Sequence, residues 1–190
     1  MNRRAIALIL ACCLALLVAC LPTYVGDPAT AKVDAKLSGI WNRTDGEGEA
    51  VWFVDALDAH TYLIRGYDIS MGEDGRRRAN LSIVAQGWLA EIGGARFVSM
   101  KTFTKDTSLG NDKGRDRYVV ARFELAADGQ ALSVRGINPD AVKDETTPDA
   151  LTKRIAASPD DGSLYLPTQT FARVDPKNPG DARTSLDAIE

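Results

Sequence analysis

Short apolar stretches separated by turn residues run through most of the chain and limit the folds that it can adopt. Glycine- and aspartate-rich segments lie between them, and the Asp128-Gly129 pair is typical of a tight β-hairpin turn. Short strands at such regular spacing predict an all-β sandwich or barrel. The predicted strands cover residues 37–42, 49–55, 61–67, 79–89, 95–103, 117–125 and 131–137.

Nearer the C-terminus the pattern changes from alternation to a helical period. Thr147 is a suitable N-cap, and Leu151 and Ile155 share one face of the predicted helix. Pro159 ends this helix, and residues 162–174 return to strand character as an edge or closing strand. We therefore expect a mainly β protein: a single up-and-down antiparallel β-barrel of about eight strands, with one short α-helix near the C-terminus.

The N-terminus has the pattern of a secretory leader. Two arginines in "MNRR" precede residues 5–19, which contain neither a charge nor a proline. A charged segment followed by an apolar one is typical of a signal peptide. The alternative is a transmembrane anchor, but such an anchor needs about 20 apolar residues, and Pro22 and Asp27 follow too soon.

The end of the apolar run, Leu17-Val18-Ala19-Cys20, resembles the lipobox of bacterial lipoproteins. The resemblance implies cleavage before Cys20, attachment of diacylglycerol to its thiol and acylation of the new α-amino group. Two buried acyl chains give stable anchoring in a membrane. Leu21, directly after the cysteine, resembles the default signal for sorting to the outer membrane of Gram-negative cells. The expected location is therefore the bacterial cell envelope, on the outer membrane and facing the periplasm.

Cysteine usage and net charge exclude several classes of function. The three cysteines lie at positions 12, 13 and 20, so cleavage and lipidation would leave none for a disulfide, a thiol nucleophile or a cysteine metal site. The net charge is −3, and it becomes −5 when Arg3 and Arg4 leave with the leader. This mild acidity argues against binding to nucleic acid, which needs a basic patch.

The chain divides into four parts by composition. Residues 1–19 form the predicted signal peptide, and residues 20–36 are rich in small, polar and proline residues and are predicted to form a flexible tether. Residues 37–174 form the predicted barrel, which is one domain by length. Residues 175–190 contain two prolines and no strand period, so we expect a disordered tail.

The first predicted strand carries a motif of a known family. Gly39-Ile40-Trp41 matches the G-x-W motif of the lipocalins, and "VDAKLSG" resembles the lead-in to that motif. The chain thus resembles small bacterial lipoproteins with a lipocalin-like domain. The resemblance implies an arginine stacked on Trp41, a contact worth about 0.5–2 kcal/mol. Arg135, at the end of the last strand before the helix, is the first candidate, and Arg173 is the competing one.

Residues that could carry catalysis are few. His60 is the only histidine, it precedes a predicted strand, and no serine lies in a G-x-S-x-G pattern. Three acidic pairs lie in glycine- or proline-flanked loops and are predicted to be solvated turns: Glu73-Asp74, Asp144-Glu145 and Asp160-Asp161. The sequence therefore predicts no enzyme, no cofactor and no metal site.

The basic run "GRRRAN" at residues 75–80 allows two interpretations. The first is a solubilising flank of a hairpin. The second is a grip on lipid phosphates or on an acidic partner, since the arginine fork binds phosphate through two hydrogen bonds.

Aromatic residues in the predicted strands favour a binding function. An eight-stranded barrel is either filled by its own side chains or holds one small ligand. We expect a cavity lined by Trp41, Trp52, Tyr62 and Trp88; the alternative is that these residues simply fill the core. The predicted function is non-enzymatic binding of a small apolar or amphipathic ligand by a lipid-anchored protein. The alternative is a membrane-held interaction module, an adaptor or inhibitor, which binds another envelope protein through an exposed apolar patch.

Overall fold

A computed structural model describes residues 21–45, 48–103, 117–177, 179 and 182–189. The predicted signal peptide, 1–19, and the predicted lipidation site, Cys20, lie outside these residues. Within the part of the chain that is described, no helix combines the length and the apolar character needed to cross a membrane.

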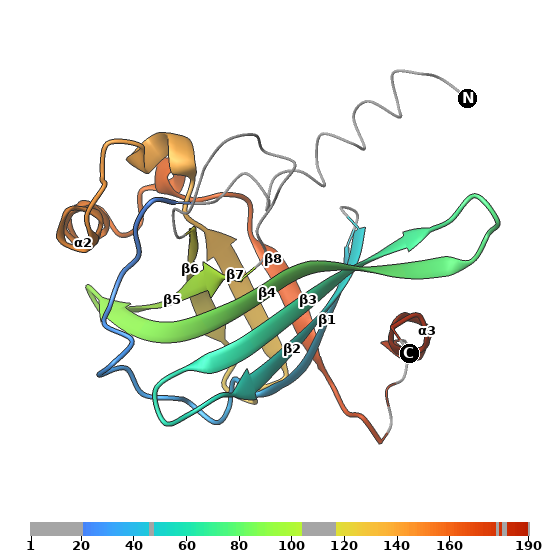
Figure 1. Cartoon of the computed structure of the whole chain (residues 1–190). Coiled ribbons are helices and arrows are strands. Elements are labelled where there is room, and N and C mark those ends of the chain that lie inside the picture. The colour runs from blue at the N-terminus through green and yellow to red at the C-terminus, as the bar shows by residue number, and fades with distance from the viewer. Residues whose placement is uncertain (1–20, 46–47, 104–116, 178, 180–181, 190) are drawn as a thin grey trace.

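Eight antiparallel strands form a closed barrel, in which each strand pairs with its sequence neighbours and β1 pairs with β8 (Figure 1). This is the mainly β, up-and-down barrel that the sequence predicts. The strands are β1 (Gly39–Asp45), β2 (Gly48–Ala56), β3 (Tyr62–Met71), β4 (Arg77–Ile92), β5 (Ala95–Thr102), β6 (Tyr118–Leu125), β7 (Ala131–Gly136) and β8 (Gln169–Val174).

The up-and-down topology gives the barrel two distinct ends. At one end, which we call the base, β1 begins and the β2–β3, β4–β5 and β6–β7 turns lie. Strands β1, β3, β5 and β7 finish at the opposite end, which we call the hairpin end because the long β3–β4 hairpin projects from it (Figure 1). Alternate residues of each strand point into the barrel, as expected for a pleated sheet.

The helix predicted from the sequence covers the outside of the barrel. It is α2 (Pro148–Ala157), and the Thr147 side chain caps it by accepting a hydrogen bond from the backbone N–H of Ala150 at 3.3 Å. Leu151 and Ile155 are fully buried in one cluster with the outward-facing side chains of β5 and β6. Two short 3-10 helices flank α2 in sequence: η1 (Pro139–Val142) and η2 (Gly162–Leu164).

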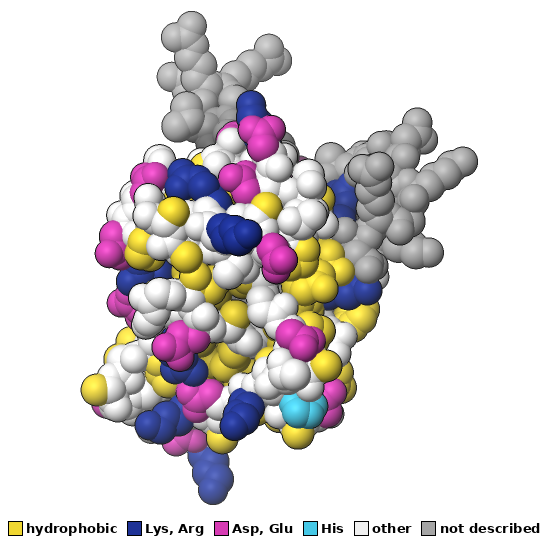
Figure 2. All heavy atoms as spheres, turned by 90° about the vertical axis from the view of Figure 1, so that its left-hand side faces the viewer, with side chains coloured by type: hydrophobic (Ala, Val, Ile, Leu, Met, Phe, Trp, Pro, Cys, Tyr) yellow, Lys and Arg dark blue, Asp and Glu magenta, His cyan; other side chains and the backbone are white. Residues whose placement is uncertain are grey.

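Figure 2 shows the side of the molecule that carries α2, the β4–β5 hairpin and the N-terminal segment. Acidic and basic side chains are interspersed there, with hydrophobic ones between them. This side therefore has no large surface of a single charge, in agreement with the small net charge of the chain.

The N-terminal segment differs from the flexible tether predicted from its composition. Residues 21–38, which we call the strap, lie along the outside of the barrel and reach the base (Figure 1). Val25 is fully buried: its N–H donates to the Ser99 hydroxyl at 3.0 Å, and its carbonyl accepts from Ser99 Oγ at 2.8 Å and from Trp88 Nε1 at 2.9 Å. The small and polar residues of the strap thus serve packing and hydrogen bonding rather than flexibility.

The C-terminal tail, predicted to be disordered, contains a short helix, α3 (Arg183–Asp187). This helix lies beside β2. The side chain of Ser185 is fully buried, and its hydroxyl donates to the carboxylate of Glu49 on β2.

Candidate functional site

The interior of the barrel contains an apolar cavity of about 50 Å³. Trp52 and Tyr62, two of the aromatic residues predicted to bind a ligand, line it. The lining side chains are hydrophobic, and the polar groups that they carry are the Tyr62 hydroxyl and the Trp52 indole N–H. The lining residues are Leu37, Trp52, Val54, Tyr62, Ile64, Leu89, Val98, Met100, Phe123, Leu132 and Val134.

The other two predicted aromatic residues do not line the cavity. Trp41 is fully buried in the same interior cluster, but it packs away from the cavity wall. Trp88 lies on the outside of β4, beneath the strap, where its ring makes edge contacts with Tyr24 at 5.3 Å and Tyr118 at 6.1 Å between centroids. Because Leu89 points into the barrel, its neighbour Trp88 must point out.

Two glycines make room for the cavity wall. A Cβ atom on Gly66 would lie 3.0 Å from Trp52 Nε1, and one on Gly87 would lie 2.7 Å from Ile64 Cδ1. Both glycines therefore allow the larger side chains to lie across neighbouring strands in the interior.

The base of the barrel is closed by the end of the strap. Leu37 is buried and forms the floor of the cavity. Three inward-facing side chains hold residues 34–38 in place, and we call them the base clamp: Tyr62, Arg96 and Arg173.

The Tyr62 hydroxyl accepts from the backbone N–H of Asp34 at 2.6 Å and donates to the carbonyl of the same residue at 3.1 Å. Burial raises the pKa of Tyr62, so this residue remains a neutral donor.

Arg96 joins β5 to the strap. It donates to the Asp34 carboxylate at 2.7 Å, and its guanidinium lies 4.7 Å from the centre of the Phe123 ring. Burial opposes ionisation of Asp34, but hydrogen bonds from Arg96 and from the backbone N–H of Lys36 outweigh it, so the pKa of Asp34 lies below its ordinary value.

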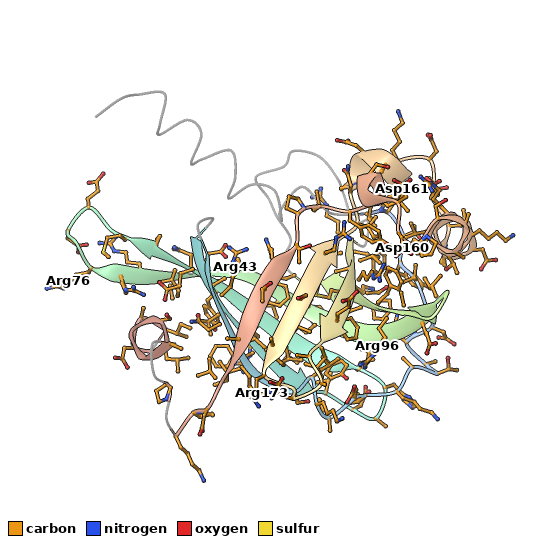
Figure 3. All side chains as sticks on the ribbon, turned by 180° about the vertical axis from the view of Figure 1, so that it is seen from behind. Arg43, Arg76, Arg96, Asp160, Asp161 and Arg173 are labelled. Carbon is orange, nitrogen blue, oxygen red and sulfur yellow. The ribbon has the colours of Figure 1, made fainter. Side chains whose placement is uncertain are left out.

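Arg173 is the arginine that stacks on Trp41, at 4.3 Å from the ring centre. It also donates to the carbonyls of Gly129 and Ser38, each at 2.8 Å, and to that of Lys36. Figure 3 shows Arg96 and Arg173 toward the base, well away from the hairpin end.

Arg135, the first candidate for this stack, is not the partner of Trp41. It lies over the ring of Tyr165, at 4.6 Å from its centre. Its neighbour Val134 points into the barrel, so Arg135 points out, whereas the β1–β8 pairing places Arg173 directly opposite Trp41.

The interior becomes polar toward the hairpin end. Alternation along β1 and β3 places Arg43 and Asp68 on the inward faces, and Arg43 is almost fully buried. Asp68 is exposed to solvent at this end of the barrel. Surrounding protein raises its pKa, although Arg43 and a hydrogen bond with Ser82 act in the opposite direction.

The residues considered for catalysis lie outside the cavity. His60 is exposed in the β2–β3 turn, where its Nδ1 lies 2.7 Å from the carbonyl oxygen of Ala31 on the strap. Asp160 pairs with Arg122 at 2.9 Å, and Asp161 caps η2 through the backbone N–H of Ser163. The described residues contain no group of three or more histidine, cysteine, aspartate or glutamate side chains suited to a metal ion.

Sequence reasoning missed most of the cavity wall and, in the base clamp, Arg96. The wall is largely aliphatic, and the one sequence signal for its residues is that they fall on the inward-facing positions of the strands. The signal for Arg96 was its position in an otherwise apolar inward row, with Val98 and Met100 two and four residues further on.

Fold and site together define a closed eight-stranded up-and-down barrel, with an apolar cavity above a base that the N-terminal strap closes. Comparison of the chain with models of protein families, with curated proteins and with solved structures found no match. The function must therefore be argued from the site itself.

Acid is expected to weaken the base clamp through Asp34. Its lowered pKa stabilises the fold fully above about pH 4, and this contribution is lost as the pH falls through the folded-state pKa, below 3.8. Because Arg96 and Asp34 are 40% and 29% exposed, the effect is less than about 1 kcal/mol. We expect Asp34→Asn to flatten the dependence of the free energy of unfolding on pH, measured by urea titration between about pH 5 and about pH 3.

Asp68→Asn serves as the contrast, because the pKa of Asp68 is raised rather than lowered. Its protonation favours the folded state, so removal of this carboxyl changes the slope with pH in the opposite direction. Equal slopes in the two variants would contradict the assignment.

Proposed function

We propose that this chain is a lipid-anchored bacterial envelope protein of the lipocalin-like kind, whose barrel binds a small apolar ligand, or the apolar part of an amphipathic one, without converting it. The lipobox-like Leu17-Val18-Ala19-Cys20 supports the anchor and outer-membrane location. The Gly39-x-Trp41 motif, with Arg173 stacked on its tryptophan, supports the family resemblance.

The observation that carries the binding proposal is the apolar cavity. Its volume of about 50 Å³ accepts a group of a few carbon atoms, since a cavity that holds benzene measures about 150 Å³. Met100 lines the wall, and an unbranched methionine side chain can change rotamer to enlarge it. The change from an apolar cavity to polar side chains at the hairpin end suits a molecule with an apolar portion and a polar head.

The closed base determines how a ligand would enter. Leu37 and the base clamp block the lower end, so entry from the hairpin end, past Arg43 and Asp68, requires no rearrangement of the strap.

The direct test fills the cavity. Val98→Phe places a ring in the cavity, whereas Val84→Phe adds the same ring on the outside of the neighbouring strand β4. A short brominated alcohol should quench tryptophan fluorescence in the unaltered protein and in Val84→Phe, with saturation, because bromine would lie beside Trp52. Quenching should be lost in Val98→Phe.

Native mass spectrometry of the detergent-solubilised protein complements this titration. A co-purified molecule identifies the ligand class by its mass. Two results together would contradict ligand binding in the barrel. The protein would carry no co-purified molecule, and quenching would not saturate or would be equal in Val84→Phe and Val98→Phe.

A second candidate function, the envelope interaction module, is favoured by the outer face of β2, β3 and β4. Phe53 and Tyr67 meet edge to face at 5.9 Å between centroids, and Leu81 is 51% exposed beside them. Large exposed apolar patches mark protein–protein interaction sites, and these three side chains would contribute to a patch of that kind. If a partner binds there, Leu81→Asp should abolish its cross-linking to the protein in detergent-solubilised membranes, whereas Val98→Phe should not.

A further inference from the structure

The chain enters the described structure in direct contact with the barrel. Leu21 is only 3% exposed, its N–H donates to the carbonyl of Tyr118 at 2.6 Å, and its carbonyl accepts from the Tyr118 N–H at 3.1 Å. Tyr118 begins β6, at the hairpin end. Residue 20 is therefore joined to the barrel wall without an intervening tether.

We infer that the hairpin end of the barrel lies on the phospholipid bilayer that holds the N-terminal anchor. This inference rests on the proposed lipidation of Cys20. A residue extends the chain by at most about 3.6 Å, so acyl chains on Cys20 would hold Leu21, and with it the hairpin end, at the headgroups.

The exposed hydrophobic side chains agree with this orientation. Met71 ends β3 and is 64% exposed, and Phe103 directly follows β5 and is 54% exposed. Both lie at the hairpin end, where insertion among lipid headgroups would remove apolar surface from water. Leu57 is 52% exposed but lies in the β2–β3 turn at the base, which makes it a matched reference position.

Arginines of the β3–β4 hairpin supply complementary charge. Figure 3 shows Arg76 at the tip of the hairpin, directed away from the barrel, and among the described residues it makes no ion pair. Arg78 pairs with Asp74 at 3.2 Å but is 63% exposed, and Arg77 pairs with Glu49. Guanidinium groups bind phosphate through two parallel hydrogen bonds, so Arg76 is placed to contact lipid phosphates.

Site-specific labelling tests the orientation on the full chain. Met71→Cys, Phe103→Cys and Leu57→Cys each introduce one free thiol, since the mature chain keeps Cys20 alone and lipid would occupy it. Each variant receives an environment-sensitive fluorophore and is reconstituted into vesicles of phosphatidylethanolamine and phosphatidylglycerol. We expect emission at positions 71 and 103 to shift to shorter wavelength and to be quenched by lipids with a quencher near the headgroup. Position 57 should keep the emission of a label in water.

Two results separate failure of the inference from failure of the anchor. The orientation alone is overturned if the chain carries the mass of its acyl groups and floats with the vesicles, but the labels at positions 71 and 103 are as exposed to water as the label at position 57. A chain without acyl mass that does not float overturns the proposed anchoring, and the inference with it.

Charge variants then test the arginines. Arg76→Gln combined with Arg78→Gln should reduce the spectral shift at position 71 and its dependence on phosphatidylglycerol content. Lys32→Gln, which removes an exposed cation from the strap near the base, should leave both unchanged. Equal effects of the two changes would overturn the role of the hairpin arginines.

Discussion

Arg173→Met is expected to lower the free energy of unfolding by about 3 kcal/mol. The methionine keeps much of the apolar stem but removes the guanidinium that stacks on Trp41 and donates to three backbone carbonyls. These bonds join β8 to the β6–β7 turn and to the strap, so their loss loosens the closure of the base. Urea unfolding followed by tryptophan fluorescence measures the change.

Arg135→Met is the matched control. This arginine stacks on Tyr165 on the outside of the barrel, and its replacement should cost only about 0.5–1 kcal/mol. Arg173→Lys separates charge from geometry, because lysine keeps the charge but cannot direct donors to three carbonyls at once. A loss for Arg135→Met that equals or exceeds that for Arg173→Met would contradict the assignment of Arg173.

Val25→Asp is expected to destabilise the protein by about 3–5 kcal/mol, because it places an unpaired carboxylate in a fully buried position between the strap and the barrel. The neighbouring Ser99 and Trp88 side chains are neutral, and their donors are already used by the Val25 carbonyl, so neither compensates the new charge. The midpoint of thermal unfolding and the urea midpoint should both fall.

Ala29→Asp provides the comparison within the same segment. Ala29 is exposed, so its replacement should change stability by no more than about 0.5 kcal/mol. If the strap were a loose tether, the two substitutions would have equally small effects, so the contrast between them tests the packing directly.

Local pattern was sufficient to predict most of the barrel. Each predicted strand overlaps an observed one, because most inward residues are apolar and turn residues interrupt the strands. The helix was equally accessible, since Thr147, Leu151 and Ile155 form a cap and a buried face within nine residues of chain. These signals involve neighbours in sequence, and no long-range information is needed to recognise them.

The errors have a common physical cause, which is contact between segments distant in sequence. Trp88 was assigned to the correct strand but to the wrong face, because the strap makes the outside of β4 apolar as well. The strap itself was taken for a tether since its partner Ser99 lies 74 residues further along the chain from Val25. The choice between Arg135 and Arg173 depended on the pairing of β1 with β8, which sequence alone does not give.

The long β3–β4 hairpin has a further consequence for a closed barrel. Pairing between β4 and β5 begins at Ala85, so residues 77–83 of β4 extend beyond β5. Exposed strand edges invite pairing with strands of other molecules, which leads to aggregation. The arginines that begin β4 and the irregular pairing beside Gly66 and Tyr67 oppose such addition by charge and by distortion. The same features that shape the projecting hairpin thus help to keep separate molecules from joining edge to edge.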